Sequence, residues 1–269
     1  MARIFITGSA DGLGQLAARR LAALGHDVVL HGRNRDRAQH AMRAVPGART
    51  ALEGDLASIE QTRALAQQAN AAGPFQAIIH NAGVYRPSAG RHETVDGLDD
   101  VFAINALAPY LLTALIEGPS RLIYLTSGMH QVGDPDLRDL QWSQERWYGS
   151  HAYANSKLFD VVLAFAVARL WPHVLSNAVD PGSVPTKMGG PSAPGDLEQG
   201  VATQVWLAVS DEGDAKVSGR YFYHKRARAA HPAASDVTVQ NGFLAACEQL
   251  TGVRLASVGG VMARSNTKE

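Results

Sequence analysis

Two side chains that are able to share a proton stand one helical turn apart in the segment Tyr153-Ala154-Asn155-Ser156-Lys157. The i, i+4 spacing places Tyr153 and Lys157 on one face of a helix. A free tyrosine has a pKa of about 10, too high for efficient proton transfer at neutral pH, and a neighbouring ammonium lowers it. The pair can therefore exchange a proton with an alcohol or carbonyl oxygen, although the spacing alone also describes an ordinary surface pair.

Short apolar runs alternate with longer helical patterns along the 269 residues. These elements must position the pair. The predicted strands are 3–7, 28–31, 50–53, 76–80, 121–126, 174–179 and 220–223. The predicted helices are 12–24, 36–44, 58–71, 94–117, 150–170, 197–209 and 239–250. This alternation is typical of an α/β fold, a doubly wound, Rossmann-type parallel β-sheet with helices on both faces. We predict a single domain over 1–252, followed by a tail over 253–269 that need not be ordered.

A glycine-rich turn, TGSADGLG over 7–14, joins the first predicted strand to the first helix. Gly8 permits a tight turn, Gly12 lets a ligand approach the backbone, and Gly14 lets the helix pack closely on the sheet. The helix N-terminus then offers free N–H groups to a pyrophosphate. Glycines alone are weak evidence, but their place after an opening strand favours a dinucleotide. The remaining residues of the turn expected to contact it are Ser9, Asp11 and Leu13.

The second predicted strand ends in His31-Gly32-Arg33-Asn34, where an acidic residue would mark recognition of a free ribose 2′-hydroxyl. No carboxylate stands there, and Arg33 offers a planar fork of donors to a 2′-phosphate. The sequence therefore favours NADP(H), with NAD(H) as the alternative cofactor. The competing interpretation is that Arg33 pairs with Asp36 or points to solvent.

Polar residues also follow two central strands of the predicted sheet. Thr126-Ser127 ends the fifth strand, Asn81-Ala82-Gly83 follows the fourth, and Asn105 lies in the long helical region. Ligands of doubly wound sheets bind at the carboxyl ends of the strands, so these residues are expected near the Tyr153 pair.

Taken in this order, the motifs resemble the short-chain dehydrogenase/reductase family over almost the whole chain. The resemblance implies that Tyr153 is the general acid/base and that Ser127 hydrogen-bonds the reacting oxygen. It also implies that Lys157 holds the nicotinamide ribose while tuning Tyr153, and that Asn105 supports a water relay. The further cofactor contacts that it implies are Asp55, Leu56, Asn81, Ala82, Gly83, Pro181, Gly182, Val184 and Thr186.

One departure points to a branch of that family. Tyr153 follows Ser127 by 26 residues, more than is usual in the family, and the insertion over 134–149 carries Trp142 and Trp147. This resembles the retinol-dehydrogenase-like and WW-domain-oxidoreductase-like branch, without its membrane anchor, so retinoids are not inherited as substrates. The two tryptophans either clamp the insertion to the domain or form an apolar substrate wall. Asp11 stands where that branch has a small neutral residue.

Composition excludes several other classes of protein. Twenty-five basic and 25 acidic residues leave no net charge, which argues against a nucleic-acid binder. A local basic cluster at Lys225, Arg226 and Arg228 reads as a solvated loop or helix end. No His, Asp or Glu cluster has metal-ligand spacing, so we expect no catalytic metal.

The single Cys247 excludes an intramolecular disulfide, fits a reducing compartment and has the helical spacing of a packing thiol. The chain opens without a charged leader, and it holds no run of about twenty apolar residues that would span a bilayer. We therefore expect a cytoplasmic protein without a membrane span.

The predicted reaction is hydride transfer between NADPH and a carbonyl or alcohol carbon of a small apolar substrate, with reduction as the expected direction. One alternative is a sensor or scaffold that binds NADP(H) without turnover. Another is an epimerase or dehydratase working through a transient hydride. A homodimer or homotetramer stays open, because four apolar positions can pack on the sheet, on a partner helix or both. These positions are Leu158, Val161, Val162 and Phe165.

Overall fold

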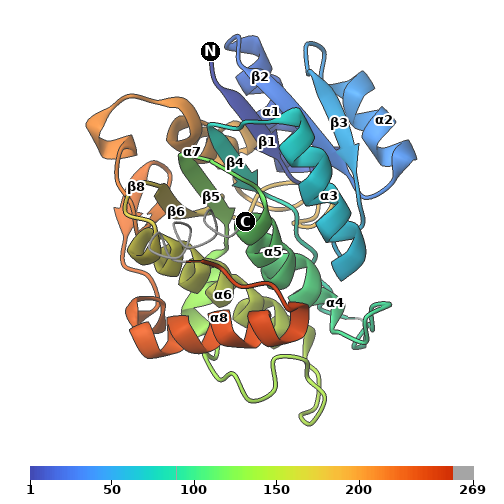
Figure 1. Ribbon diagram of the computed structural model, residues 1–269, viewed down its shortest axis with the longest axis vertical. Coiled ribbons are helices and arrows are strands. Elements are labelled where there is room, and N and C mark those ends of the chain that lie inside the picture. Colours follow the sequence, from blue (N-terminus) through green and yellow to red (C-terminus); the bar gives the residue numbers. More distant parts are fainter. Residues whose placement is uncertain (89, 257–269) are drawn as a thin grey trace, which may run out of the picture.

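The computed structural model describes residues 1–88 and 90–256. In this part of the chain a single sheet has the strand order β3-β2-β1-β4-β5-β6-β7-β8 (Figure 1). The strands are β1 (Arg3–Ile6), β2 (Asp27–Gly32), β3 (Thr50–Glu53), β4 (Ala77–His80), β5 (Arg121–Leu125), β6 (Leu175–Asp180), β7 (Arg220–Tyr223) and β8 (Arg226–Arg228). All neighbouring pairs are parallel except β7 with β8. The predicted doubly wound fold is confirmed.

Helices cover both faces of this sheet. They are α1 (Gly12–Ala23), α2 (Arg35–Ala44), α3 (Ile59–Ala72), α4 (Asp100–Phe102), α5 (Ala108–Leu115), α6 (Gly149–Leu170), α7 (Leu197–Val209) and α8 (Val237–Thr251). Helices α1, α2 and α7 share one hydrophobic core, and α3, α5 and α6 share the other. Figure 1 shows α8, in red, lying along α6, and Phe243 and Cys247 of α8 belong to the second core.

The strands divide their side chains between the two cores because successive residues of a strand point to opposite faces. In β1, Phe5 enters the core under α3, α5 and α6, while Ile4 and Ile6 enter the core under α1 and α7. Every residue of β4 is buried, which is usual for a parallel strand covered on both sides. The apolar composition of the central strands therefore follows from their place in the sheet.

The predicted helix over 94–117 is wrong at its start and in its regularity. The helix begins at Asp100, because the side chain of Asp99 caps it by accepting a hydrogen bond from the Phe102 N–H at 3.1 Å. Before it, Gly97 adopts a positive φ of 76° in a turn. A π-helical turn, η1 (Ala103–Leu107), then separates α4 from α5.

Two residues of the basic cluster, Arg226 and Arg228, lie in an edge strand, and Lys225 lies in the turn before it. His224 and Lys225 take positive φ values of 48° and 60°, which reverses the chain into β8. All three residues of β8 are exposed, and charged side chains on an edge strand discourage pairing with other chains. A strand of three residues is too short to leave a hydrophobic period in the sequence.

The folded unit extends past the predicted boundary at Gly252. The Tyr110 hydroxyl donates a hydrogen bond to the Val253 carbonyl at 2.7 Å, and Leu255 is buried. The remainder of the predicted tail, 257–269, lies outside the described residues. Cys247 is buried in α8, as its spacing predicted.

The apolar positions of α6 are used mostly within the chain itself. Leu158, Val161 and Val162 are completely buried in the core, and Phe165 is partly exposed. Of the four positions, Phe165 alone therefore leaves apolar surface for a partner helix. In the described residues, no helix combines the length and apolarity that crossing a bilayer requires.

Candidate active site

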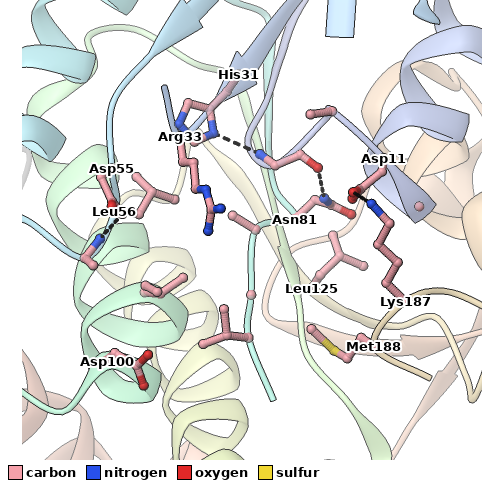
Figure 2. Close-up of a pocket in the computed structure, with 18 of the residues that line it drawn as sticks. Asp11, His31, Arg33, Asp55, Leu56, Asn81, Asp100, Leu125, Lys187 and Met188 are labelled. Atoms are coloured by element: carbon pink, nitrogen blue, oxygen red, sulfur yellow. Dashed lines mark hydrogen bonds and ion pairs between the residues drawn. The ribbon is translucent and has the colours of Figure 1, made fainter. Parts of the chain in front are cut away.

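A cavity of about 790 Å³ opens at the carboxyl ends of the strands, where the chain order reverses between β1 and β4 (Figure 2). Ligands of doubly wound sheets bind at this switch point. The predicted residues that line it are Gly8, Asp11, Gly12, Leu13, Arg33, Asp55, Leu56, Asn81, Ala82, Gly83, Tyr153, Lys157, Pro181 and Thr186. The predicted residues outside this lining are Ser9, Gly14, Asn105, Ser127, Gly182 and Val184. Most of the predicted site is thus brought together by the fold.

The segment after β4 holds the glycine turn in place by hydrogen bonds. Gly8 and Gly12 have positive φ values of 63° and 55°, which side chains other than glycine rarely adopt. The Asn81 amide donates hydrogen bonds to the Thr7 and Gly8 carbonyls at 3.0 and 3.1 Å. A Cβ on Gly14 would stand 2.5 Å from the Gly8 carbonyl oxygen. The backbone is therefore as close-packed here as a pyrophosphate cradle requires.

We expect Gly14→Ala to weaken NADP⁺ binding by about tenfold or more, because overpacking of this kind displaces backbone at a cost of about 1–3 kcal/mol. Titration of NADP⁺ by calorimetry measures the change. Gly213→Ala is the matched control, since a Cβ there meets no atom within 4 Å. Equal NADP⁺ affinity of Gly14→Ala and the control would show that the turn is not the cradle.

Ser9 of the turn and His31 of β2 support the turn from its buried side. Ser9 is buried and its hydroxyl accepts a hydrogen bond from the His31 N–H at 2.8 Å, so its side chain faces away from the cavity. His31 Nδ1 accepts from the Gly8 N–H at 3.0 Å, and its Nε2 lies 2.8 Å from the Gly54 carbonyl. Burial lowers the pKa of His31, which suits the neutral form that this pattern needs.

Cations gather at the end of the cavity near β2. Arg33 is exposed and points into the cavity, and it forms no ion pair with Asp36 (Figure 2). Asp11 instead binds two further cations of the lining, Arg37 at 2.6 Å and Lys187 at 2.8 Å. Partial burial raises the pKa of Asp11, but these pairs outweigh it and lower the pKa. The sequence prediction missed Arg37, although it follows Arg33 by four residues and lies in the first turn of α2.

Tyr153 and Lys157 of α6 also line the cavity, and both residues are buried. Lys157 Nζ lies 5.8 Å from the centre of the Tyr153 ring. The Thr126 hydroxyl donates to the Lys157 carbonyl at 2.7 Å, which ties α6 to the end of β5. The Tyr153 hydroxyl lies 3.8 Å from Met188 Sδ, and the Tyr85 ring packs 4.6 Å from the Tyr153 ring.

The charge of Lys157 lowers the pKa of Tyr153, as the sequence predicted, but the net shift of that pKa is upward. Burial raises the pKa of Tyr153, the Lys157 charge lowers it, and the Asp160 charge raises it again. The Ser127 hydroxyl contributes a smaller lowering. The pKa of Tyr153 therefore stays above its ordinary value in the free protein, so the hydroxyl is protonated at neutral pH and available as an acid.

The sequence prediction missed Asp160, which lies next to Lys157. Its carboxylate lies 2.8 Å from Lys157 Nζ, and both side chains are buried. Burial raises its pKa to about 6 against the opposing charge of Lys157. The available signal was a single acidic residue within an apolar stretch of helix, three positions after the lysine.

Asn105 and Ser127, the other two predicted catalytic residues, are held in place by hydrogen bonds. The Asn105 amide donates to the Val84 carbonyl and to the Ser156 hydroxyl, each at 3.0 Å, and its oxygen accepts from the Val84 N–H at 2.8 Å. Asn105 thus ties the segment after β4 to α6 from within the π-helical turn. Ser127 follows β5, and its hydroxyl accepts from the Met129 N–H at 3.3 Å. The water relay at Asn105 stays a prediction.

The insertion over 134–149 is fastened to the start of α4. Trp147 Nε1 donates to Asp99 Oδ1 at 3.1 Å, and the Asp99 N–H donates to the Gln141 side chain at 2.9 Å. Trp142 and Trp147 also pack in a small apolar cluster with Tyr153. These contacts favour the clamp, since neither tryptophan is among the residues that line the cavity.

The chain is similar to known proteins over almost its whole length. Residues 2–118 match the family model described as short chain dehydrogenase. The chain is 45% identical to an uncharacterized oxidoreductase of Emericella nidulans, over 94% of this chain and 98% of that protein. It is 42% identical to the short-chain dehydrogenase chry4 of Gibberella zeae, over 96% and 100% of the two chains. The chain belongs to the short-chain dehydrogenase family.

This short-chain dehydrogenase also has relatives in the branch that the insertion indicated. It is 29% identical to human retinol dehydrogenase 13, over 95% of this chain and 86% of that protein. A crystal structure from Mycobacterium paratuberculosis shares its fold, with a TM-score of 0.82 and 23% identity over 95% of both chains. A blue fluorescent protein from a metagenomic library, solved with NADPH, has a TM-score of 0.67 and 22% identity over 82% of this chain and 95% of that one. The predicted family and branch are confirmed, and with them an oxidoreductase that uses a nucleotide cofactor.

Proposed function

We propose that this short-chain dehydrogenase transfers a hydride between NADP(H) and a carbonyl or alcohol carbon of a small apolar molecule. The observation that carries the proposal is the geometry of one cavity. The glycine turn, Arg33, Tyr153 and Lys157 all line it. The residues fit the cofactor, because the close-packed, positive-φ glycines of the turn leave its backbone open to a pyrophosphate.

The residues of the chain have distinct roles in the proposed reduction. The bound nicotinamide supplies the hydride. Tyr153 donates its phenolic proton to the carbonyl oxygen, and the charge of Lys157 stabilises the phenolate that is left. Ser127 donates a hydrogen bond to the same oxygen as negative charge develops on it. In alcohol oxidation the Tyr153 phenolate takes the proton of the alcohol hydroxyl as the hydride leaves the carbon for the nicotinamide.

The preference for NADP(H) rests on charge at the end of the cavity near β2. Arg33 and Arg37 both line this end, and no carboxylate follows β2 in the position that would read a free 2′-hydroxyl. The preference for an apolar substrate rests on Met188, which lines the cavity with its Sδ 3.8 Å from the Tyr153 hydroxyl.

Purified protein tested with NADPH against aldehydes and ketones of increasing apolar size checks the proposal. We expect oxidation of NADPH with formation of the alcohol, and slower reaction with NADH. Binding of NADPH without hydride transfer in either direction would instead support the sensor or scaffold that the sequence left open.

A further inference from the structure

A buried acidic residue in α6 is not accounted for by the proposed chemistry. Asp160 lies between Phe159 and Val161, in the most apolar stretch of the helix, and 2% of its side chain is exposed. Burying a carboxylate in such a place is costly unless it is paired, and this one is paired with Lys157 alone among the described residues. The role of Asp160 therefore lies in its effect on Lys157.

The carboxylate and a backbone carbonyl together determine where the ammonium of Lys157 points. Lys157 Nζ donates to Asp160 Oδ2 at 2.8 Å and to the Leu125 carbonyl at 2.8 Å. An ammonium has three N–H groups, so one is left. Nζ also lies 3.5 Å from the position of a Cβ on Gly83, which lines the cavity beside it. The remaining N–H is thus available to a ligand in the cavity.

The other titratable groups around Asp160 do not replace this pairing. Tyr153 faces the pair from the same helix, and Tyr124 faces it from β5 with a hydroxyl already bonded to Thr113 at 2.8 Å. Asp180 acts on Tyr153 from β6 and is of the same charge as Asp160. Lys157 is consequently the one cation among these groups.

We propose that Asp160 is a positioning residue, whose carboxylate keeps the buried Lys157 charged and directs its remaining N–H into the cavity. The proposal rests on the proposed function for the identity of the ligand, the ribose next to the nicotinamide. Asp160 itself touches neither substrate nor cofactor, and acts through the lysine.

The pH dependence follows from the direction in which Asp160 titrates. Burial raises its pKa to about 6, so the carboxylate is charged above that pH and becomes protonated as the pH falls through it. Lys157 then loses the negative charge that anchors it. We expect kcat/KM to decline below about pH 6 for this reason. Asp160→Asn has no charge to lose, so its profile should lack this decline and lie roughly ten- to a hundredfold lower at neutral pH.

Ser176→Ala is the matched control for this substitution. It removes another buried side-chain contact of α6, the 2.7 Å hydrogen bond from the Ser176 hydroxyl to the Ala164 carbonyl, without changing a charge. We expect the control to keep the profile of the unmodified enzyme, including its acid decline. An Asp160→Asn enzyme that keeps the decline near pH 6 and a kcat/KM within about twofold of the control would overturn the proposal.

A binding experiment on the unmodified protein tests the same idea without turnover or a variant that must fold. NADP⁺ and adenosine 2′-monophosphate share the adenosine and the one phosphate monoester that titrates near pH 6, but only NADP⁺ carries the second ribose. The ratio of their affinities should fall as the pH is lowered through about 6, with circular dichroism showing that the protein stays folded. A ratio independent of pH would overturn the role of Asp160. Absence of turnover with normal binding would instead count against the proposed function.

Discussion

Tyr153→Phe should lower kcat for carbonyl reduction by roughly 10²- to 10⁴-fold, the range that a positioned general acid contributes. The substitution removes the hydroxyl and keeps the ring, so the packing against Tyr85 and Met188 is largely preserved. The proton for the developing alkoxide must then come from water, which is not held in position as the phenol is. Steady-state kinetics with NADPH and the best substrate of the panel measure the loss.

Tyr85→Phe is the control for this experiment. It removes a hydroxyl from the ring whose centre lies 4.6 Å from that of the Tyr153 ring, and we expect kcat to change by no more than a few fold. NADP⁺ affinity should be similar in both variants, because neither removes a contact of the glycine turn. If Tyr153→Phe keeps the activity of the control, another group supplies the proton and the assignment of Tyr153 is wrong.

Arg33→Ala should weaken NADPH binding by roughly 10- to 100-fold and leave NADH binding almost unchanged. A hydrogen bond to a charged group contributes about 1.5–3 kcal/mol, and the 2′-phosphate is the part of the cofactor that NADH lacks. Arg33 lines the cavity without an ion pair to any residue that the structure describes, whereas the neighbouring Arg37 is already held by Asp11. The ratio of kcat/KM for the two cofactors is the measurement.

Arg35→Ala is the matched control, since it removes an arginine two positions away that is exposed and lies outside the cavity lining. It changes the net charge by the same amount, so a general electrostatic effect would appear in both variants. Equal losses of NADPH affinity in the two variants would contradict a specific role for Arg33. A larger loss in a variant lacking both Arg33 and Arg37 would assign part of the phosphate contact to Arg37.

The candidate site could be predicted in large part because its residues sit in local patterns at the ends of elements. A glycine turn must follow β1 to start α1, and Tyr153 and Lys157 share a helix face whatever surrounds it. The buried central strands are readable for the same reason, since a covered parallel strand is apolar on both sides. Fourteen of the predicted cofactor and catalytic residues accordingly line one cavity.

The errors of the prediction occur where long-range contacts override local pattern. The stretch over 94–117 has helical periodicity throughout, yet its helix starts only at Asp100, where Asp99 is shared between a helix cap and the Trp147 clamp. The edge strand β8 is too short for a period, and it forms because β7 is beside it. Neither contact is visible in a single segment of sequence.

By itself, the sequence determined the order of the elements, the family and the set of residues able to do acid–base chemistry, because these depend on side-chain types at short spacings. Tertiary structure decided how those residues are charged and held. Only the folded chain shows that Asp11 binds Arg37 and Lys187, and that the acidic residue in α6 faces the lysine inside the protein. The reason is physical: burial and the distance between charges set a pKa, and both are properties of the packed molecule. The Tyr153 pair is thus present in the sequence, and its electrostatic balance arises in the fold.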